Sequence, residues 1–365
     1  MDIKALAEKY EPYIVERRRY YHSCPELSNE EKETSAQIRH DLEAMGIAVR
    51  EVPGCYGLVA DIRGGAQGAT VALRADMDAL PIKEDTGLPF ASKNEGRMHA
   101  CGHDSHVAML LGAAQILNEV KAELHGTVRL LVQPAEEVAS GALDMLKGGA
   151  LDGVSAIYGA HVWGNFDAPL IDVTPGSRMA CCDKFTIEVE GVAAHASAPH
   201  LGVDAITVSA AIINNLQQCV SRMNDPLNPL VLTIGFIEGG PRWNVISNRV
   251  RMEGTVRTFD EDLSKSEIMR RIIEDTAAAF GAKGTLEYKR LTPPLINGSD
   301  KLNAIAREAV VKLYGEQAVG HMPTMMGSED FPWLSDGGRI PYIFAFSPSM
   351  LFEDLHPLLQ IAGAG

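Results

Sequence analysis

Four short segments carry side chains that can bind metals or transfer protons. Three of them follow apolar runs with strand character, and the fourth precedes a helix-like stretch. They are RADMD at 74–78, HACGHD at 99–104, QPAEE at 133–137 and AHVW at 160–163. Open parallel sheets bind their ligands beyond the carboxyl ends of the strands. We therefore expect these side chains, far apart in the sequence, to converge: Asp76, Asp78, Cys101, His103, Glu136, Glu137 and His161.

The expected cluster has the composition of a transition-metal site. A cysteine thiolate, two imidazoles and a carboxylate form a mixed donor set that suits zinc, manganese, cobalt or nickel. The two adjacent glutamates can divide their roles, because one can bind metal while the other, aimed differently, accepts a proton from water. Each motif alone is commoner as a structural feature. Their occurrence at successive strand ends is what favours a metal site.

The elements around these segments predict an α/β domain. Residues 1–45 are expected to be helical, with an interruption near Pro25. The elements that follow are predicted as strand 71–75, helix 105–120, strand 127–133, helix 139–150 and strand 155–160. Asp104 is the expected N-cap of the first of these helices. Strands that alternate with helices indicate βαβ crossovers and a mostly parallel sheet.

A second, inserted domain is expected between residues 175 and 290. Its predicted elements are strand 183–191, helix 203–223, strands 230–240 and 246–259, a helix around 268–280, and strand 284–290. This β-α-β-β-α-β order is typical of the ferredoxin-like arrangement. The apolar strand at 340–346 is better explained as a return to the first sheet. The predicted organisation is therefore a catalytic domain formed by 1–174 and 291–365, with a satellite domain at 175–290.

Composition narrows the partners of the protein. The chain has 365 residues, with 33 Lys and Arg against 48 Asp and Glu, which gives a formal charge of −15. This acidic balance argues against a surface for nucleic acid or anionic lipid. The charged N-terminus has no apolar signal core, and the six cysteines lack the spacing of a disulfide framework. We expect a cytoplasmic protein that binds a small molecule, and neither nucleic acid nor a membrane.

Seven strings spread over nearly the whole chain occur together in one enzyme family. They are LRADMDALPIKE, MHACGHDSHVAMLLGAA, LVQPAEE, GAHVW, AHASAPHLGVDA, NVISNRVRMEGTVRTF and GSEDF. In these strings the chain resembles peptidase family M20, subfamily D, which includes N-acyl-amino-acid, hippurate and auxin-conjugate hydrolases. The resemblance implies a metallopeptidase-type α/β catalytic domain with an inserted ferredoxin-like α+β dimerisation domain. It also implies metal-dependent hydrolysis of the amide of an N-acyl amino acid.

The resemblance assigns roles in the predicted catalytic domain. The metal ligands of the family fall on Cys101, His103, Glu137, His161 and His356. They imply two divalent ions, with manganese or zinc expected first and nickel or cobalt also fitting. Glu136 matches the general base that takes a proton from the attacking water. Asp78 matches the acidic residue that supports the site by orienting a ligand or the metal.

Three residues of the predicted satellite domain match positions that face the substrate. His195 matches a histidine that reaches the substrate across a dimer, where it would stabilise the oxyanion. Asn244 and Arg257 resemble the substrate contacts of the family, since an amide and a guanidinium suit a carboxylate. The resemblance therefore implies a homodimer formed through the satellite domain.

Two other functions stay open at this point. One is a di- or aminopeptidase on the same scaffold, although dipeptidase relatives carry His-x-Asp where this chain has Asp76-Met77-Asp78. The other is a non-hydrolytic protein that binds N-acyl amino acids through a degenerate metal site. LHPLL around His356 matches the family's His-Ser/Asn-Pro-x-Phe only loosely, and the chain ends soon after it. A one-metal site is therefore the alternative to a two-metal centre.

Overall fold

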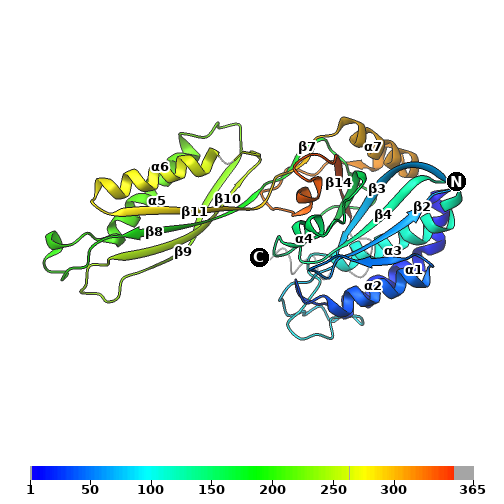
Figure 1. Ribbon diagram of the computed structural model, residues 1–365, viewed down its shortest axis with the longest axis horizontal. Helices are drawn as coiled ribbons and strands as arrows, with labels where there is room; N and C mark the ends of the chain where they lie inside the picture. Colours follow the sequence, from blue (N-terminus) through cyan, green and yellow to red (C-terminus); the bar gives the residue numbers. More distant parts are fainter. Residues whose placement is uncertain (1, 263, 349–365) are drawn as a thin grey trace. The chain divides into compact units, whose positions relative to one another are not determined.

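The chain forms two compact units, seen here in a computed structural model that describes residues 2–262 and 264–348. Unit 1 comprises Met1–Gly176, Ile296–Pro323 and Asp330–Gly365, and unit 2 comprises Ser177–Leu295 with Thr324–Glu329. Each unit has its own sheet (Figure 1). Two short strands, β7 (Gly176–Met179) and β12 (Leu295–Asn297), lie where the chain passes from one unit to the other.

Unit 1 is built on a mixed sheet of eight strands in the order β1-β2-β4-β3-β5-β14-β6-β13. The strands are β1 (Val49–Glu51), β2 (Leu58–Arg63), β3 (Ala66–Asp76), β4 (His125–Gln133), β5 (Val154–Trp163), β6 (Ile171–Asp172), β13 (Val319–Gly320) and β14 (Tyr342–Pro348). The central strands β4, β3, β5 and β14 are parallel, as the alternation of strands and helices predicts. β1 and β2 are antiparallel because the turn between them is too short for a crossover.

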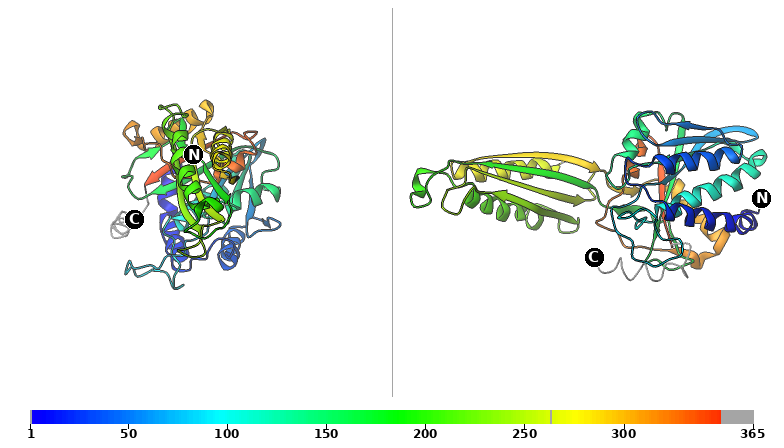
Figure 2. Two further views of the ribbon diagram at one scale, coloured as in Figure 1. Left: turned by 90° about the vertical axis from the view of Figure 1, so that its left-hand side faces the viewer. Right: turned by 90° about the horizontal axis from the view of Figure 1, so that it is seen from below.

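Three helices of unit 1 pack together against this sheet. They are α1 (Ile3–Ser23), α2 (Lys32–Ala44) and α3 (His103–Glu119). A single apolar core joins side chains of all three to those of β2, β3 and β4, among them Tyr21, Leu42 and Leu111. Figure 2 shows the same helices from two further sides. The predicted helical N-terminus with a break near Pro25 is therefore confirmed, since α1 ends at Ser23 and α2 begins at Lys32.

Two further helices complete unit 1. α4 (Gly141–Lys147) lies beside β4 and the short helix Phe331–Ser335. α7 (Asp300–Tyr314) packs on β14 through Val310 and Ala345. Within the described ranges, no helix is both long and apolar enough to cross a bilayer.

The prediction that Asp104 is the N-cap of α3 is wrong. The helix begins two residues earlier than predicted, at His103, and its N-cap is Gly102 in a left-handed conformation. Asp104 lies in the first turn, fully buried, where its Oδ2 lies 2.7 Å from His22 Nδ1 and 3.0 Å from Arg18 Nε. The helix dipole stabilises a carboxylate at this end of a helix. Arg18 and His22 of α1 hold the Asp104 side chain, which therefore does not cap a backbone amide of α3.

Unit 2 has the ferredoxin-like topology. Its elements are β8 (Cys182–Glu190), α5 (Ala205–Ser221), β9 (Leu230–Gly239), β10 (Arg249–Thr258), α6 (Ser264–Ala279) and β11 (Lys283–Thr292). The sheet is antiparallel in the order β11-β8-β10-β9. Both helices lie along one face of it (Figure 1), where alternate residues of β8 such as Phe185 and Ile187 form the core with them. The strand β9 is left at the edge of the sheet.

Candidate metal centre

The polar side chains that follow the strands of unit 1 meet at one edge of its sheet. β3 pairs in parallel with both β4 and β5, so the carboxyl ends of the three strands lie together. Asp78 follows β3, the two glutamates follow β4, and His161 lies near the end of β5. His103 opens α3, with Cys101 two residues before it.

Several groups at this edge have the spacing of a metal site, and two overlapping ones contain the predicted ligands. The ligand atoms of Cys101, His103 and His161 lie within 4.8 Å of one another, as do those of His103, Glu136 and Glu137. Cys101 Sγ is 3.3 Å from His161 Nε2, and His103 Nε2 is 3.9 Å from Glu137 Oε1. His103 belongs to both groups, so the two form one continuous cluster. His356, the remaining predicted ligand, lies outside the described residues.

The donor atoms of this cluster fit a divalent cation. His103 Nε2, Glu137 Oε1 and Asp78 Oδ1 are buried and have no hydrogen-bond partner among the described residues. An unpartnered buried polar atom is unfavourable because it has lost its water. A cation bound between His103 Nε2 and Glu137 Oε1 would satisfy both atoms. Together with the thiol and the second imidazole, it would have the mixed donor set of zinc or manganese sites.

The electrostatics of three of these residues favour their uncharged forms. Burial raises the pKa of the Cys101 thiol and of the Glu137 carboxyl, and it lowers the pKa of His161 to about 3. A neutral imidazole is the metal-binding form of histidine. A divalent cation that displaces the protons of the thiol and the carboxyl would supply the missing positive charge.

Asp78 holds His103 in the orientation that a ligand needs. His103 Nδ1 lies 2.8 Å from the backbone carbonyl of Asp78, which can only accept, so Nδ1 carries a proton and Nε2 faces the cluster. The Asp78 carboxylate accepts hydrogen bonds at Oδ2 from Ser28 Oγ (2.7 Å) and Glu137 N (3.0 Å). Burial opposes its ionisation, yet these bonds and His103 lower the pKa of Asp78 below its ordinary value. Asp78 thus contacts both His103 and the turn that carries the glutamates.

The two glutamates stand on a tight turn after β4. Ala135, directly before them, has a left-handed backbone with φ 51°, and Ala139 N donates to Glu136 O at 2.7 Å. Both glutamate side chains are half-buried. Glu136 Oε1 accepts a hydrogen bond from Asp330 N at 3.3 Å. The turn therefore presents two adjacent carboxylates to His103 in different surroundings.

A buried network behind the cluster includes residues without a predicted role. Asp76, fully buried, contacts His106 Nδ1 through one oxygen and Arg74 Nη1 through the other, at 2.6 Å. Arg74 also pairs with Asp330 at 3.2 Å, and His106 Nε2 accepts from Val162 N at 2.9 Å. Both ring nitrogens of His106 are therefore engaged. Asp76 converges as predicted, and its carboxylate lies against His106 and 3.6 Å from His103 Nε2.

The predicted substrate residues all lie in unit 2. His195 is exposed, and its Nδ1 accepts a hydrogen bond from Ser197 N at 3.2 Å. An accepting Nδ1 leaves the proton of a neutral imidazole on Nε2. Ala196 N donates to the backbone oxygen of Asn244 at 3.1 Å, so His195 and Asn244 are held side by side. Asn244 Oδ1 is buried without a hydrogen-bond partner in the part of the chain that the structure describes.

Arg257 lies near the end of β10, far from the end of this strand that follows Asn244. It is the penultimate residue of β10, whereas Asn244 precedes the start of β10 at Arg249. Arg249 and Arg257 are eight residue steps apart along the extended strand, about 27 Å. Arg257 Nη1 donates to Ser328 Oγ at 2.9 Å, and its Nε donates to Thr255 Oγ1 at 3.2 Å. Unit 2 therefore does not bring Arg257 together with His195 and Asn244.

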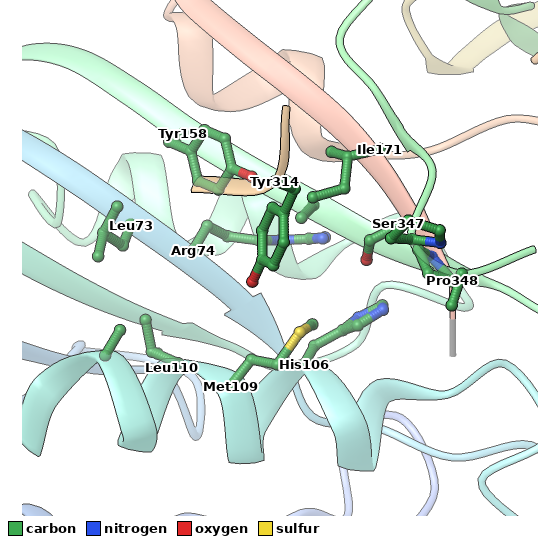
Figure 3. Close-up of a pocket in the computed structure, with 14 residues that line it drawn as sticks. Leu73, Arg74, His106, Met109, Leu110, Tyr158, Ile171, Tyr314, Ser347 and Pro348 are labelled. Carbon is green, nitrogen blue, oxygen red and sulfur yellow. The ribbon is translucent and has the colours of Figure 1, made fainter. Parts of the chain in front are cut away.

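A large cavity of unit 1 lies beside the cluster and has a different character. It has a volume of about 540 Å³, and side chains from β3, β5, α3 and α7 line it. Figure 3 shows Met109 and Leu110 of α3 facing Tyr158 and Tyr314 across it. His106 and Arg74 reach its wall, but Cys101, His103, Glu137 and His161, the candidate ligands within the described residues, do not. The largely apolar lining assigns no metal chemistry to this cavity.

Comparison with known proteins identifies the class of the chain. Residues 72–357 match Peptidase family M20/M25/M40. The chain is 43% identical over 356 residues to N-acetyl-L-cysteine deacetylase of Bacillus subtilis, covering 94% of this chain and 84% of the relative. It is 40% identical over 299 residues to N-acyl-L-amino acid amidohydrolase of Geobacillus stearothermophilus, covering 81% of each.

A solved structure agrees with these relatives. The crystal structure of a dinuclear metal binding peptidase of the M20 family from Bacillus subtilis superposes with a TM-score of 0.83 at 37% identity, covering 97% of this chain and 96% of that one. The chain belongs to peptidase family M20. The resemblance seen in the sequence strings is confirmed, and so is the fold class of an α/β domain with an inserted ferredoxin-like domain.

Proposed function

We propose that this protein is a metal-dependent amidohydrolase that cleaves N-acyl amino acids into a carboxylate and a free amino acid. The cluster of Cys101, His103, His161 and Glu137 with Glu136 beside it carries the proposal, because it joins a metal-binding donor set to a second, adjacent carboxylate. Relatives with about 40% identity are named for the same reaction class. The acyl group would be acetyl, benzoyl or a similar group.

The proposed metal ligands are Cys101, His103, Glu137, His161 and His356, holding two divalent ions, manganese or zinc. Bound there, such ions would polarise the scissile carbonyl and make a nearby water more acidic. Asp78 would keep His103 Nε2 turned toward them through the bond from Nδ1 to its carbonyl oxygen.

Glu136 is the proposed general base. A ligand atom of its half-buried carboxylate lies within 4.8 Å of those of His103 and Glu137, and Glu136 Oε1 accepts a hydrogen bond from Asp330 N. It would take a proton from water as the water attacks the amide carbonyl, and would then pass this proton to the leaving amine. One carboxylate can serve both proton transfers. The attacking water and the leaving amine are bonded to the same carbon atom, so both lie within its reach.

His195, Asn244 and Arg257 are the proposed substrate contacts. A proton on His195 Nε2 would allow this nitrogen to donate to the oxyanion that forms during attack. Asn244 and Arg257 would bind the substrate carboxylate. Because β10 separates them by tens of ångströms within one unit, we infer that a second copy of the chain supplies His195 and Asn244.

A panel of amides tests the proposed function. The protein would be treated with a chelator and assayed for amine release from N-acetyl, N-benzoyl and indole-acetyl amino acids and from dipeptides, before and after addition of Mn²⁺ or Zn²⁺. We expect cleavage of the acyl compounds to be lost on chelation and restored by metal, while dipeptides are left intact. Cleavage of dipeptides alone would identify a peptidase. Metal binding and substrate binding without turnover would identify a non-hydrolytic binding protein.

The edge strand of unit 2 supports the proposed homodimer. β9 pairs only with β10 in the described sheet, and Val231, Phe236 and Ile237 on it are 37%, 45% and 54% exposed. An exposed apolar edge strand readily pairs with another chain. The acidic charge and the six free cysteines fit the proposed location of this dimer in the reducing cytoplasm.

Charges placed on this edge should separate the dimer. The double variant Phe236→Asp with Ile237→Asp is expected to sediment with the mass of one chain, because two buried carboxylates on each side would repel. It should also lose most of its kcat/KM if the partner supplies His195. Phe280→Asp, at an equally exposed position after α6, is the matched control and should stay dimeric. An unchanged dimer in the double variant would contradict this interface.

A further inference from the structure

The loop between α1 and α2 contacts both turns that carry the proposed catalytic groups. We call residues 26–31, ELSNEE, the clamp loop. On the β3 side, Ser28 Oγ donates to Asp78 Oδ2 at 2.7 Å, and the carbonyl of Glu26 accepts from Ala79 N at 2.8 Å. On the β4 side, Glu31 Oε1 accepts from Ala135 N at 2.8 Å. The clamp loop therefore joins two strand ends that lie far from it in the sequence.

The contact of Glu31 falls on a backbone position that needs support. Ala135 is fully buried and has φ 51°, a left-handed conformation that residues other than glycine rarely adopt. Its amide is the last one before Glu136. A change of the backbone at Ala135 would therefore move both glutamate side chains. The carboxylate of Glu31 is the partner that holds this amide.

We propose that Glu31 is a positioning residue, whose carboxylate holds the left-handed turn at Ala135 and so aims Glu136 and Glu137 at the site. This inference rests on the proposed role of Glu136. Glu31 acts through the backbone of Ala135 and contacts no reacting atom itself.

The burial of Glu31 is unfavourable, which points to a role other than stability. The residue is completely buried, and its second oxygen has no hydrogen-bond partner within the described residues. Burial raises the pKa of Glu31 to about 7, although backbone amides, including that of Ala135, oppose the shift. A hydrophobic side chain of similar size would avoid this loss of hydration. The position nevertheless keeps a carboxyl group, and one oxygen of this group accepts the hydrogen bond from Ala135 N.

Three variants separate the hydrogen-bond acceptor from the volume and charge of Glu31. Glu31→Gln keeps an oxygen for Ala135 N and should stay within a few-fold of wild-type kcat. Glu31→Leu removes the acceptor and should lower kcat on the order of 10²-fold with little change in KM, as expected when a catalytic group is displaced by about 1 Å. Glu33→Leu is the control, because the Glu33 side chain is 79% exposed and pairs with Lys32 at the surface.

Glycine at position 135 provides a rescue that a general loss of stability would not show. Glycine adopts the left-handed conformation without penalty. The double variant Glu31→Leu with Ala135→Gly should therefore have a kcat about tenfold higher than that of Glu31→Leu alone. If Glu31→Leu does not fold, Glu31→Asp replaces it, since this variant keeps the charge but withdraws the oxygen by one methylene. Wild-type kcat in Glu31→Leu or Glu31→Asp, or no rescue by glycine, would overturn the proposal.

Hydrogen–deuterium exchange gives a readout that does not depend on catalysis. In peptides covering residues 133–141, exchange should be faster in Glu31→Leu than in wild type, and close to wild type in Glu31→Gln. Metal content, measured on the same samples, reports whether Glu137 has also moved. If the wild type cleaves none of the amides, the proposed function fails while the exchange result still tests Glu31. Equal exchange in wild type and Glu31→Leu would refute the positioning role.

Discussion

Glu136→Gln is expected to lower kcat by about 10²–10⁴-fold, the contribution typical of a general base, while the protein keeps its metal. Glutamine has the same shape and retains an oxygen that can accept from Asp330 N, so the turn after β4 should be preserved. It cannot take a proton from water. Because the lost interaction belongs to the transition state, kcat and kcat/KM should fall together and KM should change little.

The neighbouring glutamate provides the matched control for this variant. Glu137→Gln changes the same functional group one residue away, on the carboxylate whose Oε1 lies 3.9 Å from His103 Nε2. It should lose bound metal as well as activity, whereas Glu136→Gln should show wild-type metal content by elemental analysis. Added metal should then restore part of the activity of Glu137→Gln only. A Glu136→Gln enzyme with wild-type turnover would exclude Glu136 as the base.

The convergence of the candidate ligands could be predicted because a parallel sheet imposes it. Cys101 and His161 are far apart in the sequence, yet their Sγ and Nε2 atoms lie 3.3 Å apart. Cys101 precedes a helix and His161 lies near the end of a strand, and the apolar pattern of the sequence indicates both elements. Parallel strands end at a common edge of the sheet, which brings the two residues together. The periodicity of apolar residues in β8 and α5 likewise defines the ferredoxin-like unit.

The supporting contacts could not be predicted, since they depend on the path of loops between elements. Glu31 accepts a hydrogen bond from Ala135 N, and Arg74 forms an ion pair with Asp330. Both pairs are far apart in the sequence, and no periodicity of apolar residues relates their members. The N-cap of α3 was likewise not predictable from the residue type of Asp104 alone. Its residue type suits an N-cap, but Arg18 and His22 on another helix draw it into the first turn of α3.

Arg74 is the position of unit 1 where one substitution should destabilise the fold most. Its side chain is fully buried and forms ion pairs with Asp76 at 2.6 Å and Asp330 at 3.2 Å. Arg74→Met would leave both carboxylates buried without this counter-charge. Removing one partner of a buried ion pair costs about 3–5 kcal/mol, which for a domain of this size lowers Tm by roughly 6–20 °C. Thermal unfolding of the chelated protein, followed by circular dichroism, measures this loss.

An exposed ion pair of similar geometry is the control for Arg74→Met. Arg39 and Glu51 also approach to 2.6 Å, but their side chains are 32% and 74% exposed. Arg39→Met should therefore cost less than about 1 kcal/mol. Equal melting temperatures for the two variants would contradict a stabilising role of the buried pair.

The pH dependence of this difference tests whether Arg74 stabilises the ionised form of Asp76. Burial opposes the ionisation of Asp76, but Arg74 and the neighbouring histidines lower the pKa of Asp76 well below its ordinary value. A carboxylate with a lowered pKa contributes stability above its unfolded pKa of about 4, and this contribution is lost as the pH falls through the folded pKa. Without Arg74, Asp76 can take up a proton at higher pH and so relieve its buried charge. The difference in unfolding free energy between wild type and Arg74→Met should therefore be largest near pH 7 and narrow as the pH falls toward 4 and below. A difference that grows on acidification would show that Arg74 does not act through Asp76.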